Sequence, residues 1–477
     1  MAAVPRLARA REGLRLAAGT SDAERRAPPD VPSLASADGL QLDPGSRVAV
    51  VGGGPSGSLF AYFLLRLANA VDLELQVDVF EPRRFSHGGP AGCNHCGGIV
   101  SESLVQMLAT DGVNLPPSVV QRGIYSYVLH MDVGTVEIES PVAEQRIASI
   151  YRGNGPRGGE DMPWESFDGF LQKTAEKEGA HIVHKLVTGL TRRPDGRPIV
   201  RTADGEESVY DFVTLATGVN SNFNQILSDG FVEGAPEVSR TFICEFRAGE
   251  ERIHEVLGDS MHVFLLDIPR LEFAALIPKG DYVTMAMLGE EIDRPLIGRF
   301  LDAPEVKAAF PVDMVPGVCT CAPLINVKGP SRPYGDRVAL VGDMGVTRLY
   351  KDGIGAAFRT AKAAAEAALI HGISAEALEA HYMPTCRAIA VDNRFGQVIF
   401  AFTTIFRRSA FARRIVLHMT AREQAGRGGK HMSHVLWNMF TGSTPYRDVF
   451  VRTLHPGFMF GLVRSFLVCL FTRRKGG

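Results

Sequence analysis

The sequence predicts an α/β protein with a Rossmann-like dinucleotide-binding domain, and three observations support this prediction. A short apolar strand, residues 47–51, runs into a glycine-rich turn and an apolar helix. A second strand, residues 73–80, follows that helix and ends at the acidic Glu81. Two later strands, residues 211–218 and 337–343, again end in small or acidic residues. This order is typical of a parallel sheet with helical crossovers.

The turn after the first strand has the spacing Gly-x-Gly-x-x-Gly. Its glycines permit a tight turn, close approach of a pyrophosphate and close packing of helix on strand. The N-terminus of the helix offers unpaired N–H groups to the phosphates. Glu81, followed by Pro82, stands where an acidic side chain holds the ribose hydroxyls. The residues expected to bind the nucleotide in the turn are Gly52, Gly54, Pro55, Ser56 and Gly57.

Two later segments make FAD, rather than NAD, the expected cofactor. Strand 211–218 ends in a small-residue crossing beside a bound dinucleotide, and strand 337–343 ends in a carboxylate that would bind a ribityl hydroxyl. A glycine turn then opens an alanine-rich helix, whose N-terminal dipole would stabilise negative charge on the reduced flavin. The cofactor-binding residues expected here are Ala216, Thr217, Gly218, Gly342, Asp343, Gly353, Ile354 and Gly355.

In chain order, the motifs GGGPSG, FD-x-x-L, ATG-x-x-S, VGD and DGIG resemble those of the large flavoprotein group that includes p-hydroxybenzoate hydroxylase. Within that group the chain looks most like the geranylgeranyl reductases, over roughly residues 46–375. The resemblance implies a FAD-binding domain of the glutathione-reductase type, an inserted antiparallel β-sheet substrate domain and an active site at their interface. It also implies that Asp168 and Leu171 lie on a helix of the FAD domain and that Val187 lies near the adenine.

The expected domain organisation follows from these motifs and from shifts in composition. Residues 4–17 are arginine-rich and begin a flexible leader, for which a transit peptide is the alternative interpretation. The expected boundaries are 1–45 for this basic leader, 46–125, 160–225 and 330–372 for the FAD-binding domain, 126–159 and 226–329 for the substrate domain, and 373–477 for a helical C-terminal region.

Residues 88–103 form a glycine-rich loop after the second strand. In the reductases that the chain resembles, a similar loop passes close to the isoalloxazine, and Cys96, Gly97 and Gly98 match it. Cys96 would donate a proton during reduction of an alkene or quinone, or would only pack against the ring. His95 titrates nearer neutral pH and is a second candidate donor, with a surface histidine as the alternative.

Lys351 and Asp352 place a charged pair directly before the second glycine turn. Lys351 is the third catalytic candidate, because its ammonium would pair with the reduced flavin anion or meet an acidic substrate. Asp352 is expected to cap the following helix, its carboxylate accepting hydrogen bonds from N–H groups.

The strand at residues 273–278 bears on the substrate. Geranylgeranyl reductases carry Tyr-x-Trp-x-Phe-Pro here and flavin halogenases carry Trp-x-Trp-x-Ile-Pro, whereas this chain has Phe273, Ala275 and Ile277 before Pro278. Loss of both Trp positions argues against a halogenase and leaves an apolar channel. We expect hydride transfer from reduced flavin to a double bond of an isoprenoid lipid or to a quinone-like substrate. A monooxygenase of an apolar or aromatic substrate is the main alternative.

The electron donor stays open between NAD(P)H and ferredoxin, and the latter would require a redox partner protein. A flavin–dithiol or metal protein is a further alternative, because Cys93 pairs with Cys96 and Cys319 with Cys321 in the sequence. Four thiolates suit zinc or an iron–sulfur centre. Alternate residues of a strand point to opposite faces, however, so at most one of the second pair would face the loop. We therefore expect no metal.

Charge and cysteine content predict location. Seven cysteines in 477 residues are too few for a disulfide framework and favour a cytoplasmic protein. From residue 401 onward there are 13 Lys and Arg against 2 Asp and Glu, although the whole chain has a formal net charge of −2. This basic tail fits an anionic membrane surface, and no motif indicates nucleic acid. Residues 456–470, apolar apart from Arg464, predict an interfacial helix, with packing on the body as the alternative.

Overall fold

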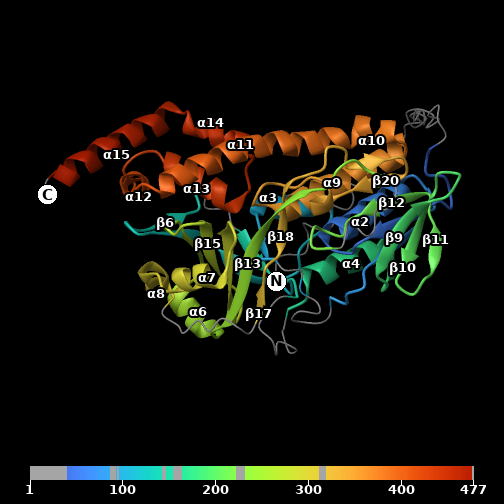
Figure 1. The fold of residues 1–477 in the computed structure, drawn as a ribbon, viewed down its shortest axis with the longest axis horizontal. Coiled ribbons are helices and arrows are strands. Elements are labelled where there is room, and N and C mark those ends of the chain that lie inside the picture. Colours follow the sequence, from blue (N-terminus) through green and yellow to red (C-terminus); the bar gives the residue numbers. More distant parts are fainter. Residues whose placement is uncertain are drawn as a thin grey trace, which may run out of the picture. The chain divides into compact units, whose positions relative to one another are not determined.

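The computed structural model describes residues 40–85, 93, 96–141, 147–153, 164–221, 231–310 and 319–474, without the side chains of Cys319 and of residues 472–474. From Leu40 onward the chain forms one compact unit. Its elements are labelled in Figure 1. Two large sheets and a group of C-terminal helices organise it, and the functional site lies where they meet.

The first sheet has six strands in the order β19-β20-β12-β1-β2-β8. Strand β1 lies near its centre and pairs in parallel with β2 and β12. Only the β19–β20 pair is antiparallel. The carboxyl ends of the five parallel strands therefore share one edge. The strands are β1 (Arg47–Val51), β2 (Gln76–Phe80), β8 (His181–Val183), β12 (Phe212–Leu215), β19 (Tyr334–Gly335) and β20 (Val338–Leu340).

Strand β1 is apolar on both sides because both faces of this sheet are covered. Val48 and Val50 pack with helices α2 (Pro55–Ala70) and α9 (Gly353–Glu366). Ala49 and Val51 point the other way and pack against the three-stranded sheet β11-β10-β9. That small antiparallel sheet consists of β9 (Val187–Arg192), β10 (Pro198–Thr202) and β11 (Glu207–Val209). Helix α4 (Phe167–Lys177) also packs on α2 and carries Asp168 and Leu171, as the resemblance implied.

The second sheet has eight strands in the order β17-β13-β16-β15-β14-β5-β6, with β18 pairing beside β17 on the long strand β13. It is antiparallel except for the parallel pair β14–β5. Helices α6 (Glu250–Leu257), α7 (Arg294–Leu301) and α8 (Pro304–Ala309) cover one face. The strands are β5 (Ser126–Met131), β6 (Gly134–Glu139), β13 (Glu237–Arg247), β14 (Ser260–Phe264), β15 (Leu271–Pro278), β16 (Tyr282–Gly289), β17 (Cys319–Cys321) and β18 (Leu324–Lys328).

Helices from the C-terminal region cover the other face of the second sheet. Trp437 and Phe440 of α13 (His431–Thr441) pack on Tyr127 of β5, each with ring centroids 5.4 Å apart. The remaining C-terminal helices are α10 (Ala375–His381), α11 (Met383–Arg407), α12 (Ala410–Gln424), α14 (Tyr446–Thr453) and α15 (Pro456–Arg474). Short elements near the site are β3 (Ile99–Val100), α3 (Glu102–Thr110), β4 (Val120–Ile124), β7 (Ile147–Ile150), η2 (Gly342–Met344) and η3 (Ala367–His371).

The fold class predicted from the sequence is confirmed: a Rossmann-like sheet, a mainly antiparallel second sheet and a helical C-terminal region are all present. The segment boundaries proposed for the domains stay a prediction. Among the described helices, no single one is long and apolar enough to cross a membrane. The residues Tyr446–Thr453 and Pro456–Phe471, bent by 59° at their junction, pass that test only as a pair, by length and composition.

Candidate active site

A cavity of about 810 Å³ lies at the carboxyl edge of the six-stranded sheet. Its other walls come from β13, β15, β16 and β18 of the second sheet and from the end of α13. Open parallel sheets bind ligands at this edge, and cavities of this size hold cofactors or drug-sized molecules. The cavity thus joins the predicted nucleotide site to the second sheet.

Most of the cofactor-binding residues predicted from the sequence line this cavity. Three of the predicted glycines, Gly57, Gly342 and Gly355, do not line the cavity, and they pack against residues behind its wall. A Cβ atom at Gly342 would lie 2.7 Å from the Ser56 side chain, and one at Gly355 would lie 2.2 Å from the Asp352 carboxylate. The predicted residues on the wall are Gly52, Gly54, Pro55, Ser56, Glu81, Pro82, Gly97, Gly98, Val187, Ala216, Thr217, Gly218, Asp343, Gly353 and Ile354.

The turn between β1 and α2 fits a pyrophosphate. Gly52 has φ +105°, and a Cβ there would lie 2.5 Å from the carbonyl oxygen of Ala216. At Gly57 a Cβ would lie 1.8 Å from the carbonyl oxygen of Gly52. No side chain caps α2 at Gly54, so its first-turn N–H groups face the cavity without a side-chain partner. Such a terminus binds phosphate well.

Glu81 lies on the cavity wall with its carboxylate already held in place. It accepts hydrogen bonds from the Gly53 N–H at 3.1 Å and from the backbone and side chain of Arg83 at 3.1 and 3.0 Å. A carboxylate has about four acceptor sites. Glu81 therefore keeps a fixed orientation and can still accept ribose hydroxyls, while Arg83 balances its charge.

Asp343 and Asn326 form the wall at the end of β20. Burial raises the pKa of Asp343, against the lowering effects of Thr347 and Arg152. The Asn326 side chain donates from Nδ2 to the carbonyl oxygens of Asp343 and Gly345, at 2.8 and 3.1 Å. Its Oδ1 is buried and has no hydrogen-bond partner in the described residues. A buried acceptor without a partner fits a ligand that brings N–H or O–H donors, such as a flavin.

Two buried cations surround the predicted Cys96 loop. The Cys96 Sγ accepts a hydrogen bond from the Gly98 N–H at 3.3 Å. Arg152 lies beside Cys96 and forms a two-pronged ion pair with Asp168, with both distances 2.8 Å. Burial works against the charge of Arg152, but Asp168 and Cys96 outweigh it and raise the pKa of Arg152.

Lys279 is the second buried cation, and its side chain binds the backbone of the Cys96 loop. Its side chain is fully buried and donates to the carbonyl oxygens of Gly97 at 2.6 Å and Gly98 at 3.0 Å. Burial lowers the pKa of Lys279 to about 8, against the opposing attraction of Glu245 and Cys96. Arg152 and Lys279 thus place two positive charges around the Cys96 loop.

Lys351 reaches the cavity from the turn before α9. Its Nζ lies 4.3 Å from the centroid of the Phe273 ring, a cation–π contact. Burial alone lowers the pKa of Lys351 to about 8. The Lys351 amine therefore titrates near neutral pH. It lies where helix α9 and the second sheet both line the cavity.

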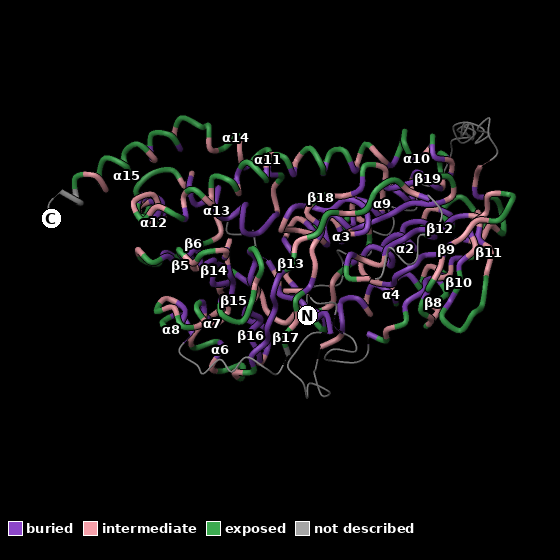
Figure 2. The backbone as a smooth tube through the Cα atoms, viewed as in Figure 1, coloured by how far each residue is buried: buried purple, intermediate pink, exposed green. Residues whose placement is uncertain are grey.

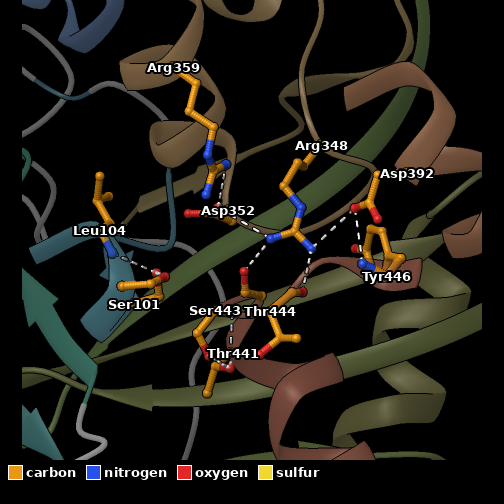
Figure 3. A network of polar contacts seen from close by, with 12 residues as sticks. Ser101, Leu104, Arg348, Asp352, Arg359, Asp392, Thr441, Ser443, Thr444 and Tyr446 are labelled. Carbon is orange, nitrogen blue, oxygen red and sulfur yellow. Dashed lines mark hydrogen bonds and ion pairs between the residues drawn. The ribbon is translucent and has the colours of Figure 1, made fainter. Parts of the chain in front are cut away.

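The expected capping role of Asp352 is wrong. Asp352 occupies the N-cap position of α9 with φ +56°, but its carboxylate makes no cap hydrogen bond. It pairs instead with Arg348 at 3.3 Å and Arg359 at 3.2 Å (Figure 3). Two guanidinium groups bind a buried carboxylate more strongly than neutral N–H groups do. The N-terminus of α9 is therefore left open toward the cavity, where Gly353 lies.

Arg348 ties the C-terminal region to the site. Its guanidinium donates to the carbonyl oxygens of Gly442 and of Thr444, the latter at 2.8 Å, and stacks over the Tyr446 ring at 4.7 Å (Figure 3). Helix α13, which ends at Thr441, thereby adds Phe440 and Thr441 to the cavity wall. No local pattern in the sequence predicts this contribution, because the partners lie more than ninety residues apart.

The half of the cavity formed by the second sheet is apolar. Phe273, Ala275 and Ile277 all line it, as the alternation of side chains along a strand requires. The other apolar residues of this wall are Phe242, Ile243, Met261, Ala286, Met287, Leu288 and Phe440. The apolar channel expected from the sequence thus faces the cofactor-binding half of the same cavity.

Some predicted features lie outside the described residues. His95 is one of them, and so is the side chain of Cys319. Cys96 lines the cavity and Cys93 is buried, and no disulfide joins the cysteines whose side chains are described. No group of three His, Cys, Asp or Glu in the described part of the chain is placed to hold a metal ion.

Replacing Arg152 with Met is expected to destabilise the protein strongly. Asp168 is fully buried and would lose its two-pronged ion pair with Arg152, which typically costs about 3–5 kcal/mol of unfolding free energy. Urea denaturation measures this effect. The matched control is Arg201→Met, in an exposed pair with Glu207, for which the expected loss is below about 1 kcal/mol. Equal losses in the two variants would contradict this account of the buried pair.

No family model matches the chain. A curated relative, the geranylgeranyl diphosphate reductase of Synechocystis sp., is 26% identical over 204 residues, which cover 43% of this chain and 42% of the relative. The chain therefore matches less than half of that relative's length.

Among solved structures, the flavin-dependent halogenase CmlS has a TM-score of 0.55 at 17% identity, covering 86% of this chain and 76% of the halogenase. The tetrameric form of 2-methyl-3-hydroxypyridine-5-carboxylic acid oxygenase has a TM-score of 0.51 at 15% identity, covering 77% and 93%. These likenesses concern the fold. The fold is that of FAD-dependent oxidoreductases, and the glycine fingerprint and the cavity that it lines fit FAD as the cofactor.

Proposed function

We propose that this chain reduces a double bond of an isoprenoid lipid, or a quinone-like apolar substrate, by hydride transfer from reduced FAD. One observation carries the proposal. A single cavity joins an apolar wall from β13, β15 and β16 to two groups able to handle charge and protons, Cys96 and Lys351. The name of the reductase that is 26% identical to part of this chain supports the choice of substrate class.

Each part of the cavity has a role in this proposal. Bound FAD, when reduced, supplies the hydride. The apolar wall binds the hydrocarbon and excludes water from the reacting carbons. Lys351 places a positive charge where negative charge develops on the substrate or cofactor. Cys96 gives a proton to the carbon that does not receive the hydride, so the double bond gains two hydrogens and the thiolate left behind is stabilised by Arg152 and Lys279.

Incubation of the FAD-loaded protein with a prenyl diphosphate or a prenylquinone tests this function. NAD(P)H and reduced ferredoxin are supplied in separate reactions, since either is a candidate donor. We expect mass spectrometry to show a product heavier by two hydrogens for each reduced double bond. Unchanged substrates with both donors would contradict the proposal.

A monooxygenase is the second candidate, because an oxygenase shares the fold over 77% of this chain. In that case the product would gain one oxygen atom, and oxygen would be consumed in equal amount. The same mass measurement, repeated with and without air, separates the two functions. A product that forms without air and carries no added oxygen supports reduction.

A further inference from the structure

Helix α15 leaves most of its large apolar side chains exposed, whereas an ordinary surface helix buries them. Phe458 and Leu462 are exceptions and pack in the core. The helix contacts α12 through small residues: Ser465, only 1% exposed, hydrogen-bonds to His418, and Gly461 lies against Met419. Figure 2 shows α15 as largely exposed. The side chains left outside form what we call the α15 apolar face: Met459, Phe460, Val463, Phe466, Leu467, Val468 and Phe471.

The same part of the molecule is strongly basic. Residues 401–477 contain 13 Lys and Arg but only 2 Asp and Glu. One of those two acids, Glu423, is buried and accepts hydrogen bonds from the N-terminus of α13. Arg464 lies within α15, and together with Arg422 of α12 it adds to burial in lowering the pKa of His418. Large apolar side chains and an excess of positive charge therefore occur on one pair of helices.

Further exposed apolar side chains lie on helix α11, whose other side borders the cavity. A small side chamber of about 20 Å³ shares Phe273, Lys351 and Phe440 with the main cavity and is walled by Phe400 and Thr403 of α11. The neighbouring α11 residues Phe402 and Ile405 are 64% and 69% exposed.

An aromatic contact joins α15 to α12, the helix that follows α11. Helix α11 ends at Arg407, and Phe411 at the start of α12 packs edge-on against Phe466, with ring centroids 5.4 Å apart.

We propose that the α15 apolar face docks on a bilayer that contains anionic lipids. Aromatic and aliphatic side chains enter the boundary between headgroups and acyl chains, and Arg414 and Arg422 of α12 and Arg464 of α15 bind the anionic headgroups. A second copy packing this face against itself in a two-fold dimer would bring the same basic residues to it, since residues 401–477 hold only 2 Asp and Glu. Charge complementarity therefore favours the lipid surface over self-association.

Vesicle flotation with the FAD-loaded full chain tests this surface without any turnover. We expect flotation with vesicles of phosphatidylcholine and phosphatidylglycerol, less flotation with phosphatidylcholine alone, and partial release by high salt. The triple variant Phe460→Ser, Val463→Ser, Leu467→Ser should lower the bound fraction at least about tenfold, since its burial in lipid is lost. Circular dichroism and flavin absorbance should stay unchanged.

The matched control replaces three exposed apolar residues far from α15 in the sequence, Val71, Tyr125 and Val238, with Ser. It should float like the parent protein. Parent protein that does not float, or a triple variant that floats equally well, would overturn the proposal. So would light scattering that shows a dimer of the parent, a monomer of the triple variant and no flotation of either, since the face would then bind a second copy.

Discussion

Gly57→Ala is expected to abolish FAD binding. The added Cβ would lie 1.8 Å from the carbonyl oxygen of Gly52, a distance at which the backbone itself must move. That movement displaces the turn whose N–H groups are placed to hold the pyrophosphate. We expect purified Gly57→Ala protein to lack flavin absorbance and to show at least about a hundredfold weaker binding in a titration with FAD, which corresponds to about 2.7 kcal/mol.

The control for this change is Gly298→Ala. Gly298 also lies in a helix, α7, but a Cβ there meets nothing within 4 Å. Because alanine favours helix more than glycine does, the variant should bind FAD normally and gain up to about 1 kcal/mol of stability. Normal flavin content in Gly57→Ala would contradict the assignment of this turn as the pyrophosphate site.

Lys351→Met is expected to reduce turnover at least about a hundredfold, the usual loss on removing a group that handles charge or protons in a reaction. In the parent protein, the rate should fall as pH rises through about 8, because Lys351 then loses its proton. This fall should be absent in the variant. Rates of substrate reduction between pH 6 and 10 provide the measurement.

The same variant should be more stable than the parent protein at pH 7. Partial burial lowers the folded-state pKa of Lys351 from 10.5 to about 8, so below pH 8 the folded protein carries a partly desolvated charge that the unfolded chain keeps in water. This penalty, about 3 kcal/mol, disappears as pH rises from 8 to 10.5 and is absent in the Lys351→Met variant at every pH. Urea denaturation at pH 7 measures it.

A gain in stability with a loss of turnover would mark Lys351 as a functional rather than a structural residue. The control is Lys173→Met, whose exposed ammonium pairs with Glu165. Neither turnover nor stability should change much there, because exposed pairs contribute little. Unchanged turnover in Lys351→Met would remove Lys351 from the proposed mechanism.

Local sequence patterns predicted residues that the fold brings together at one cavity. The glycine turn, the small-residue crossing after β12 and the turn before α9 are each set by residues that are neighbours in the chain. Steric limits at such turns admit few side chains, so the residue types themselves carry the information. Fifteen of the predicted cofactor-binding residues line the cavity, although three of them, Gly97, Gly98 and Val187, were expected from the family resemblance and not from local turn geometry.

The surroundings of Cys96 could not be predicted in this way. Lys279 reaches the loop from 182 residues away, and only the packing of the second sheet on the first brings them together. The Asp352 prediction failed for a different reason: Arg348 and Arg359, four and seven residues away, pair with the carboxylate that an N-cap would direct to the helix N–H groups. Rules based on neighbouring residues do not predict which charged side chains pair in the interior.

The most direct test of the central claim is an anaerobic reoxidation experiment. The FAD-loaded protein is reduced without oxygen and then mixed with a prenyl diphosphate or a prenylquinone. We predict that the absorbance of oxidised flavin returns, with one double bond or quinone reduced for each flavin oxidised. Flavin that stays reduced with every apolar substrate, and is oxidised only when air is admitted together with formation of an oxygenated product, would contradict the account.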